Sequence, residues 1–312
     1  MSHDGLWSIG ELAEHAGVTV KTVRFYSDRG LLPEASRSTG GHRRYAPASL
    51  DRLRLIRSLR ALDLPLPEVH RVLDEQEPGR ALEDAVAGRL REVGSRLREL
   101  RWREAALRLV QECPPGERAE RLLLLGGMTT PPSTDAPARF WRAWLPARMP
   151  APAVAAFLEV AVPVPPDDPD PAQVLAFARL HALTSRPCPG GARQPRPEAH
   201  RVAGARGTAV LYAGLAEAYE SAAVHVRRDR PPGPGDALDG FVAAYAQAYD
   251  RRDTPGFRRA LARELAAETR LDAYWDLVSV LTTAPGARPE PTPGSTHDWL
   301  LAALTAEVTA SA

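Results

Sequence analysis

The chain has 312 residues, a formal net charge of +1 and 44% hydrophobic residues. This length leaves room for two domains, each with a hydrophobic core of its own. No apolar run approaches the roughly 20 residues of a membrane-spanning helix, and no signal-peptide pattern precedes the first helical pattern. We therefore expect a cytoplasmic protein without a membrane partner.

Residues 8–17 are predicted to form a short helix. Ser8 and Glu11 make the S-x-x-E pattern of a capping box, in which each side chain accepts a free amide hydrogen at the helix start. Gly17 is expected to end the helix, because glycine tolerates the left-handed conformation found there. One face is apolar, with residues at helical spacing: Ile9, Leu12, Ala13 and Ala16.

A second helix is predicted from its N-cap, Thr19, to Gly30. Val20 and Val23 form the expected buried face, with Phe25 as a further candidate. The expected exposed side carries polar and aromatic residues: Lys21, Thr22, Arg24 and Tyr26. Two short helices around a tight turn form a helix-turn-helix, which places its second helix in the major groove of DNA.

A basic ribbon is predicted to follow. Ser38-Thr-Gly-Gly41 is a turn sequence between two short arms, and the arms carry Arg37, His42, Arg43, Arg44 and Tyr45. Residues 21–60 hold ten basic and three acidic residues, a local balance of +7 in a chain of net charge +1. Basic charge is thus concentrated where phosphate would have to be neutralised; the alternative is a merely solvated charged face.

These elements resemble the DNA-binding domain of the MerR family of bacterial transcription regulators over residues 6–75. The family pattern is matched by Thr22-Val-Arg24-Phe-Tyr26, Gly30-Leu-Leu32, Arg37 and Gly41-His-Arg43-Arg-Tyr45. His42 departs from the pattern, since the family usually has tyrosine there. The resemblance implies that Arg24 and Tyr26 reach DNA from the recognition helix, while Arg37 and Arg43 hold the backbone from the wing.

The full set of expected DNA contacts comes from the second helix and the ribbon: Thr19, Lys21, Thr22, Arg24, Tyr26, Arg37, Gly41, His42, Arg43 and Tyr45. The resemblance also implies double-stranded promoter DNA and RNA polymerase holoenzyme as partners. It implies that a dimer binds a pseudo-palindromic site and bends and untwists an overlong promoter spacer.

A long helix is predicted within residues 77–112, because no proline occurs from Arg80 to Gln111. Apolar residues recur along it at the steps of a coiled-coil seam: Leu90, Val93, Leu97, Leu100 and Leu107. The alternative is an amphipathic helix that packs on its own domain. With the resemblance, we expect this helix to join two copies in a homodimer.

Residues 113–312 are expected to form an all-helical effector-binding domain whose helices are joined by proline-rich loops. The predicted fold class is therefore mainly α, with a winged helix-turn-helix at 1–76, a coiled-coil dimerisation helix at 77–112 and this helical domain. The two cysteines, Cys113 and Cys188, lack metal-ligand spacing. We predict no metal site and no cofactor.

The expected effector is a small organic molecule, because aromatic residues recur in pairs that would stack a ring: Trp141 and Trp144, Tyr212 and Tyr219, Tyr245 and Tyr249, Tyr274 and Trp275. Aromatic residues at helical spacing are more often core. No nucleophile triad, phosphate loop or zinc motif occurs, so we expect no enzyme. A fused enzyme and a protein-interaction module remain the alternatives for this domain.

Overall fold

The computed structural model describes residues 5–74, 79–146, 149–185, 204–266, 271–284 and 286–310. The chain forms two compact units, residues 1–97 and 98–312, and the boundary falls inside one helix, α5 (Arg80–Glu112). The three segments predicted from the sequence divide the chain at other points, after residues 76 and 112, and stay a prediction.

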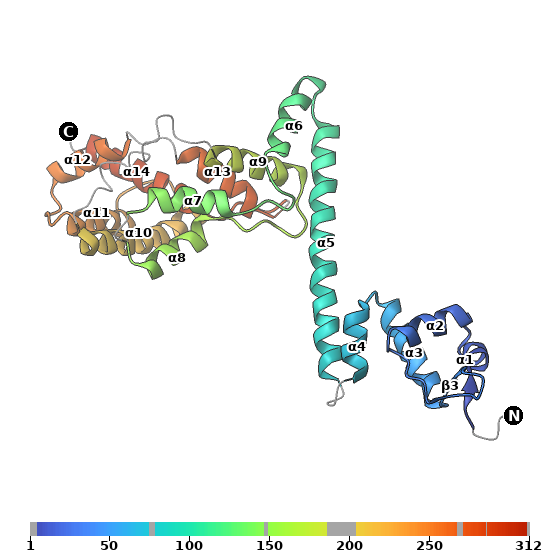
Figure 1. Ribbon diagram of the computed structural model, residues 1–312. Coiled ribbons are helices and arrows are strands. Elements are labelled where there is room, and N and C mark those ends of the chain that lie inside the picture. Colours follow the sequence, from blue (N-terminus) through green and yellow to red (C-terminus); the bar gives the residue numbers. More distant parts are fainter. Residues whose placement is uncertain are drawn as a thin grey trace. The chain divides into compact units, whose positions relative to one another are not determined.

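The first unit contains two short helices, a small sheet and two further helices before α5 (Figure 1). The elements are β1 (Trp7–Ser8), α1 (Ile9–Ala16), α2 (Val20–Asp28), β2 (Ser36–Arg37), β3 (Arg43–Tyr45), α3 (Ala48–Ala61) and α4 (Leu66–Asp74). The strands lie in the order β1-β3-β2, and both pairs are antiparallel. The predicted helix-turn-helix and ribbon are confirmed as local structure.

One arginine of α3 connects three segments of this unit. The Nε atom of Arg52 donates to the carbonyl oxygen of Leu31 at 2.7 Å, and Nη1 donates to that of Leu73 at 3.2 Å. Its Nη2 atom pairs with Asp74 at 2.9 Å. Because Leu31 follows α2 directly, this side chain fixes the C-terminal end of α2 against α3 and α4.

The second unit is helical throughout the part that the structure describes (Figure 1). Its elements after α5 are η1 (Pro115–Glu117), α6 (Arg118–Gly126), α7 (Asp135–Trp144), α8 (Ala151–Ala161), α9 (Pro171–Ser185), α10 (Gly204–Arg227), α11 (Asp236–Ala248), α12 (Pro255–Ala266), α13 (Asp272–Thr282) and α14 (Pro293–Ala310). Four of these elements, η1, α9, α12 and α14, begin at a proline, which suits the first helical position because its missing N–H would have no partner there. Proline therefore both ends and starts helices in this unit.

Two apolar clusters form the core of the second unit. One lies among α10, α11, α12 and α14, with Leu211, Phe241, Tyr245 and Leu300 fully buried. The other joins the C-terminal half of α5 to α7, α9 and α13. The buried face of α5 in this cluster consists of Trp102, Ala105 and Leu109, and the Trp102 indole donates to the carbonyl oxygen of Pro166 at 3.0 Å.

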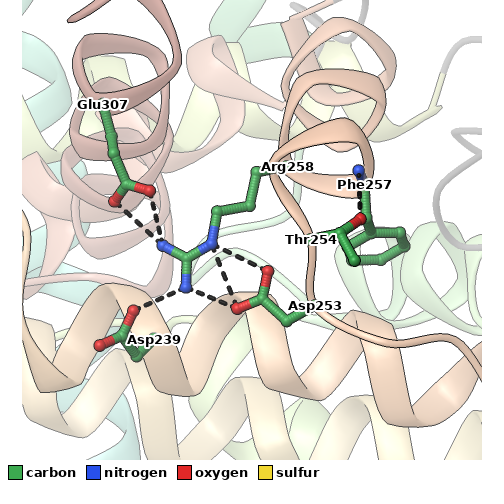
Figure 2. Close-up of polar contacts among 6 residues, drawn as sticks. All are labelled: Asp239, Asp253, Thr254, Phe257, Arg258 and Glu307. Carbon is green, nitrogen blue, oxygen red and sulfur yellow. Dashed lines mark hydrogen bonds and ion pairs between the residues drawn. The ribbon is translucent and has the colours of Figure 1, made fainter. Parts of the chain in front are cut away.

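Arg258 links three helices of the first cluster through carboxylates (Figure 2). Its guanidinium donates to both oxygens of Glu307 at 2.9 and 3.0 Å, to Asp253 at 2.6 and 2.9 Å, and to Asp239 at 2.7 Å. The hydrogen bonds that Arg258 donates to Asp253 raise the pKa of Arg258 most. Since α11, α12 and α14 each supply a residue, this network sets their spacing.

Among the helices that the structure describes, none combines the length and the apolar character needed to cross a bilayer.

Candidate nucleic-acid interface

The turn between α1 and α2 is built by local capping. The Ser8 Oγ accepts from the Glu11 amide at 3.2 Å, and Glu11 accepts from the Ser8 amide at 2.6 Å, so the predicted capping box is confirmed. Gly17 has φ of 61° and closes α1 in the left-handed region. Thr19 then caps α2 by accepting from the Thr22 amide at 3.2 Å. These contacts set the direction in which α2 leaves the turn.

The exposed face of α2 carries Lys21 and Arg24. Within the part of the chain that the structure describes, neither cation has an ion-pair partner. Thr19 is exposed and Thr22 is half-buried beside them, at the end of α2 where free amides favour an anion. The helix therefore offers two positive side chains and a positive dipole end to one side.

Two aromatic residues of α2 lie opposite to their predicted sides. Tyr26, expected on the exposed side, is 9% exposed and belongs to the core, whereas Phe25 is 41% exposed. Val20 is also 39% exposed. The guanidinium carbon of Arg29 lies 4.4 Å from the centre of the Phe25 ring, a cation–π distance. Tyr26 follows the buried Val23 by three residues, so the two share one face of α2, and this spacing was the signal that could have placed Tyr26 correctly.

The ribbon places two arginines opposite each other. Arg37 of β2 is the direct partner of Arg43 in β3, and Ser36 is the partner of Arg44. The turn between the strands includes Gly41 with φ of 77°, and the amide of His42 donates to the Ser38 Oγ at 3.1 Å. His42 is exposed at the tip of the ribbon. Like charges directly across two strands destabilise a sheet unless a counter-charge lies near.

Carboxylates provide that counter-charge. Glu34 pairs with the Nε of Arg37 at 2.9 Å and with the Nε of Arg43 at 3.3 Å. Asp28, the last residue of α2, pairs with the Nη1 of Arg43 at 2.5 Å. The hydrogen bond that Arg43 donates to Asp28 raises the pKa of Arg43. Neither acid was predicted as part of the interface, although their position among ten basic residues was the signal that could have identified them.

Tyr45, predicted to contact DNA, lies in the core instead. Its side chain is fully buried, and its hydroxyl donates to the Ser27 Oγ at 3.0 Å. Because Tyr45 of β3 also pairs with Trp7 of β1, it anchors the ribbon to the core rather than facing outward. Tyr26 and Tyr45 thus support the surface that Lys21, Arg24, Arg37, His42 and Arg43 form.

Comparison with known proteins identifies this unit. The family described as MerR HTH family regulatory protein matches residues 7–76. The HTH-type transcriptional activator TipA of Streptomyces coelicolor is 51% identical over 69 residues, 22% of this chain and 27% of TipA. The mercuric resistance operon regulatory protein of Bacillus cereus is 31% identical over 111 residues, 34% of this chain and 84% of that protein. The chain belongs to the MerR family.

Two further similarities differ in how much of the chain they cover. The nodulation protein NolA of Bradyrhizobium is 47% identical over 68 residues, 22% of this chain and 29% of NolA. The chain therefore spans less than a third of the length of TipA and NolA. A crystal structure of a MerR-family transcriptional regulator from Bacillus cereus covers 50% of this chain and 95% of that chain at 22% identity, with a TM-score of 0.25.

Helix α5 of this MerR-family chain has two different apolar faces. The predicted seam residues are all exposed: Leu90 67%, Val93 49%, Leu97 45%, Leu100 50% and Leu107 71%. Other residues of α5 do the packing, namely Ala85 in the first unit and Trp102, Ala105 and Leu109 in the second. The seam is thus distinct from the residues that attach α5 to its own chain.

The predicted effector-binding aromatics lie in the core of the second unit. Trp141, Trp144, Tyr274 and Trp275 share one cluster, and Trp141 has Phe140, Phe157 and these three rings within 5.0 to 5.6 Å. Tyr245 is fully buried in the other cluster, with Tyr212, Tyr219 and Tyr249 half-buried against it. The rings fill space with one another, so the structure supports the core interpretation.

Two hollows of this unit lie elsewhere, along α12 and α14. One of about 710 Å³ is lined by Gly256, Arg259, Ala262, Arg263, Ala266, Thr305, Val308 and Thr309. A smaller one of about 200 Å³ adjoins Arg258 and Glu307. None of the predicted aromatics lines either hollow.

Among the described residues, no group of three or more His, Cys, Asp or Glu side chains is arranged to bind a metal ion. Cys113 is a free thiol whose sulfur donates to the Val110 carbonyl oxygen at 3.3 Å. Cys188 lies outside the described residues.

Proposed function

We propose that this protein is a transcription regulator that binds promoter DNA as a homodimer. One observation carries the proposal: a helix-turn-helix presents Lys21 and Arg24, which have no ion-pair partner among the described residues, beside a ribbon that holds Arg37 and Arg43. In this geometry α2 enters the major groove and the ribbon contacts the phosphate backbone on one side. Membership of the MerR family supports the same arrangement.

The homodimer rests on the seam of α5. An exposed apolar row from Leu90 to Leu107 costs free energy in water, and a second copy of the same helix would cover it. Because each copy carries one α2, the dimer would read a pseudo-palindromic site through two successive major grooves. The remodelling step follows from the resemblance: the bound dimer bends and untwists an overlong promoter spacer so that RNA polymerase holoenzyme engages both promoter elements.

A small organic effector acting on the second unit completes the proposal. Since Trp141 and its neighbours pack against one another, a ligand reaches these rings only when α7, α8 or α13 moves. Such a ligand can shift the protein only by binding one dimer geometry better than another, with a usual coupling of about 1–3 kcal/mol. With no catalytic motif, we propose regulation rather than enzymatic activity, in the cytoplasm.

The decisive experiment measures oligomeric state and DNA binding together. Sedimentation of the full chain at micromolar concentration should give a dimer, and footprinting on a duplex that the protein selects from a random-sequence pool should protect two symmetric half-sites. A monomer that bound the same DNA as a monomer would contradict the proposal.

The effector is tested by thermal shift of the full chain against aromatic and cationic compounds. A ligand whose stabilisation survives alanine substitution of Trp141, Trp144, Tyr245, Tyr249 and Trp275, in a chain that remains folded, would exclude the aromatic site. A partner protein recovered with a chain that binds no ligand would favour the interaction module instead.

A further inference from the structure

The cations of the proposed DNA interface fall into two groups. Lys21 and Arg24 on α2 have no ion-pair partner in the described part of the chain. Arg37 and Arg43 on the ribbon, by contrast, are both held by carboxylates. The free protein therefore pairs Arg37 and Arg43 with carboxylates and leaves Lys21 and Arg24 available.

The ribbon pairs form one connected group. Glu34 uses one oxygen for Arg37 at 2.9 Å and the other for Arg43 at 3.3 Å, while Asp28 holds the opposite end of the Arg43 guanidinium at 2.5 Å. Two carboxylates thus balance two guanidinium groups. Glu34 is 33% exposed and Arg43 is 29% exposed, so this pair is partly shielded from water, whereas Arg37 and Asp28 are 58% and 52% exposed.

We propose that Glu34 and Asp28 act as internal counter-ions that occupy Arg37 and Arg43 in the free protein and compete with DNA phosphate for them. This inference rests on the proposed function, because it assigns the two acids a role in the same interface. Carboxylate and phosphate oxygens accept from the same guanidinium N–H groups. A phosphate that binds Arg43 must therefore displace Asp28 or Glu34, or share the guanidinium with them.

The effect of such counter-ions is independent of DNA sequence. Phosphates are the same at every base pair, so the competition weakens binding to all duplexes equally. Base reading from α2 is unaffected, because Lys21 and Arg24 take no part in the group. Exposed ion pairs are individually weak, which allows phosphate to replace them.

Replacement of Glu34 tests the inference with DNA of any sequence. For Glu34→Gln, fluorescence anisotropy of a mixed-sequence duplex of about 30 base pairs should show binding tightened about threefold to eightfold at about 100 mM KCl. The slope of log K against log salt, measured between about 50 and 200 mM KCl, should steepen by up to roughly 0.9. Asp28→Asn, which removes one of the two counter-ions of Arg43, should act in the same direction.

Two controls separate this role from a general charge effect. Glu68→Gln removes one negative charge from another partly shielded ion pair, that with Arg71 at 3.5 Å, and should leave the salt slope within error of the wild type. Glu34→Asp retains the charge and should keep the affinity and slope near those of the wild type. Circular dichroism of each variant verifies that it is folded.

Each result decides the inference. Weaker binding by Glu34→Gln, or an unchanged slope in both Glu34→Gln and Asp28→Asn, would overturn it, since the acids would then orient the arginines or do nothing. An equal gain in Glu68→Gln would also overturn it. A wild-type protein with no salt-dependent binding to duplex DNA would instead remove the proposed function, and the inference with it.

Discussion

The Tyr45 hydroxyl donates a hydrogen bond of 3.0 Å to the Ser27 Oγ, which ties the base of the ribbon to α2. The two residues lie 18 positions apart in the chain. Since Tyr45 is fully buried, this bond sets the spacing between the two elements of the proposed interface from inside the unit.

Tyr45→Phe should therefore lower stability more than DNA affinity. The loss of one partly buried hydrogen bond costs about 1 kcal/mol of unfolding free energy, while the ring still fills its place. Urea unfolding followed by circular dichroism measures this cost. Ser27→Ala should cost a similar amount, and the double variant little more than either single one. A large loss of DNA binding at unchanged stability would show that Tyr45 reaches DNA after all.

Arg24 and Arg43 should differ in what they contribute to binding. Arg43→Ala should weaken binding to all duplexes and flatten the salt dependence by roughly 0.9 in slope for each lost phosphate contact. Arg24→Ala should weaken the cognate site by about 1–3 kcal/mol more than random DNA, as expected for a base contact. Anisotropy titrations on both duplexes measure this difference. Equal losses for Arg24→Ala on the two duplexes would make it a backbone contact.

Charge placed in the seam of α5 should separate the proposed dimer. Leu97→Glu is expected to shift the full chain from dimer to monomer at micromolar concentration, because two copies would bring buried like charges together. Sedimentation velocity measures the shift. Val160→Glu replaces an apolar residue that is 61% exposed on α8 and should leave the oligomeric state unchanged. Dimerisation that survived Leu97→Glu, Leu90→Glu and Leu107→Glu would place the interface elsewhere.

Acid should destabilise the second unit through His297. Burial lowers the pKa of His297 to about 4, below the value of about 6.5 in an unfolded chain. As the pH falls, the imidazole of His297 is protonated in the unfolded chain before it is protonated in the folded one. The free energy of unfolding therefore has its full His297 contribution above about pH 6.5 and loses it as the pH falls toward 4. The loss amounts to about 3 kcal/mol at most. Melting temperatures between pH 4 and 8 should fall less steeply in His297→Gln than in the wild type.

Asp298 requires a control in that experiment, because it titrates in the same range with the opposite sign. Burial, and then the nearby Asp272 and Asp276, raise the pKa of Asp298 to about 6. Its protonated form stabilises the fold at low pH, and this stability is lost as the pH rises through about 6. The melting temperatures of the wild type and His297→Gln are therefore also compared in a background that carries Asp298→Asn in both proteins. An identical pH profile with and without His297 would show that the histidine does not titrate on unfolding.

Two glycines of the α10–α11 pair should respond oppositely to alanine. A Cβ on Gly214 would lie 2.7 Å from the Cβ of Ala244, so Gly214→Ala should cost about 1–3 kcal/mol through overpacking. Gly240 of α11 has open space, and Gly240→Ala should gain up to about 1 kcal/mol from helix propensity. Denaturant midpoints of the second unit measure both changes. A neutral Gly214→Ala would mean that the two helices are not in close contact at this point.

The sequence alone determined the features that depend on neighbours within a few residues. The capping box of Ser8 and Glu11, the left-handed Gly17 and the proline-free run of α5 are local, because their energies come from backbone groups one turn away. The order of these elements also carried the MerR-family resemblance. The helical nature of the second unit followed in the same way from proline placement and the absence of an alternating strand pattern.

Only the tertiary structure decided which side chains face outward and which ions pair. Tyr26 belongs to the core and Phe25 is 41% exposed, the reverse of the sides predicted for them. Asp28 meets Arg43 across 15 residues, and the Tyr274 hydroxyl donates to the Ala161 carbonyl oxygen across 113 residues. Such contacts depend on how distant segments pack. The same packing places the aromatic side chains that were predicted to line a pocket in, or against, the two apolar clusters of the core.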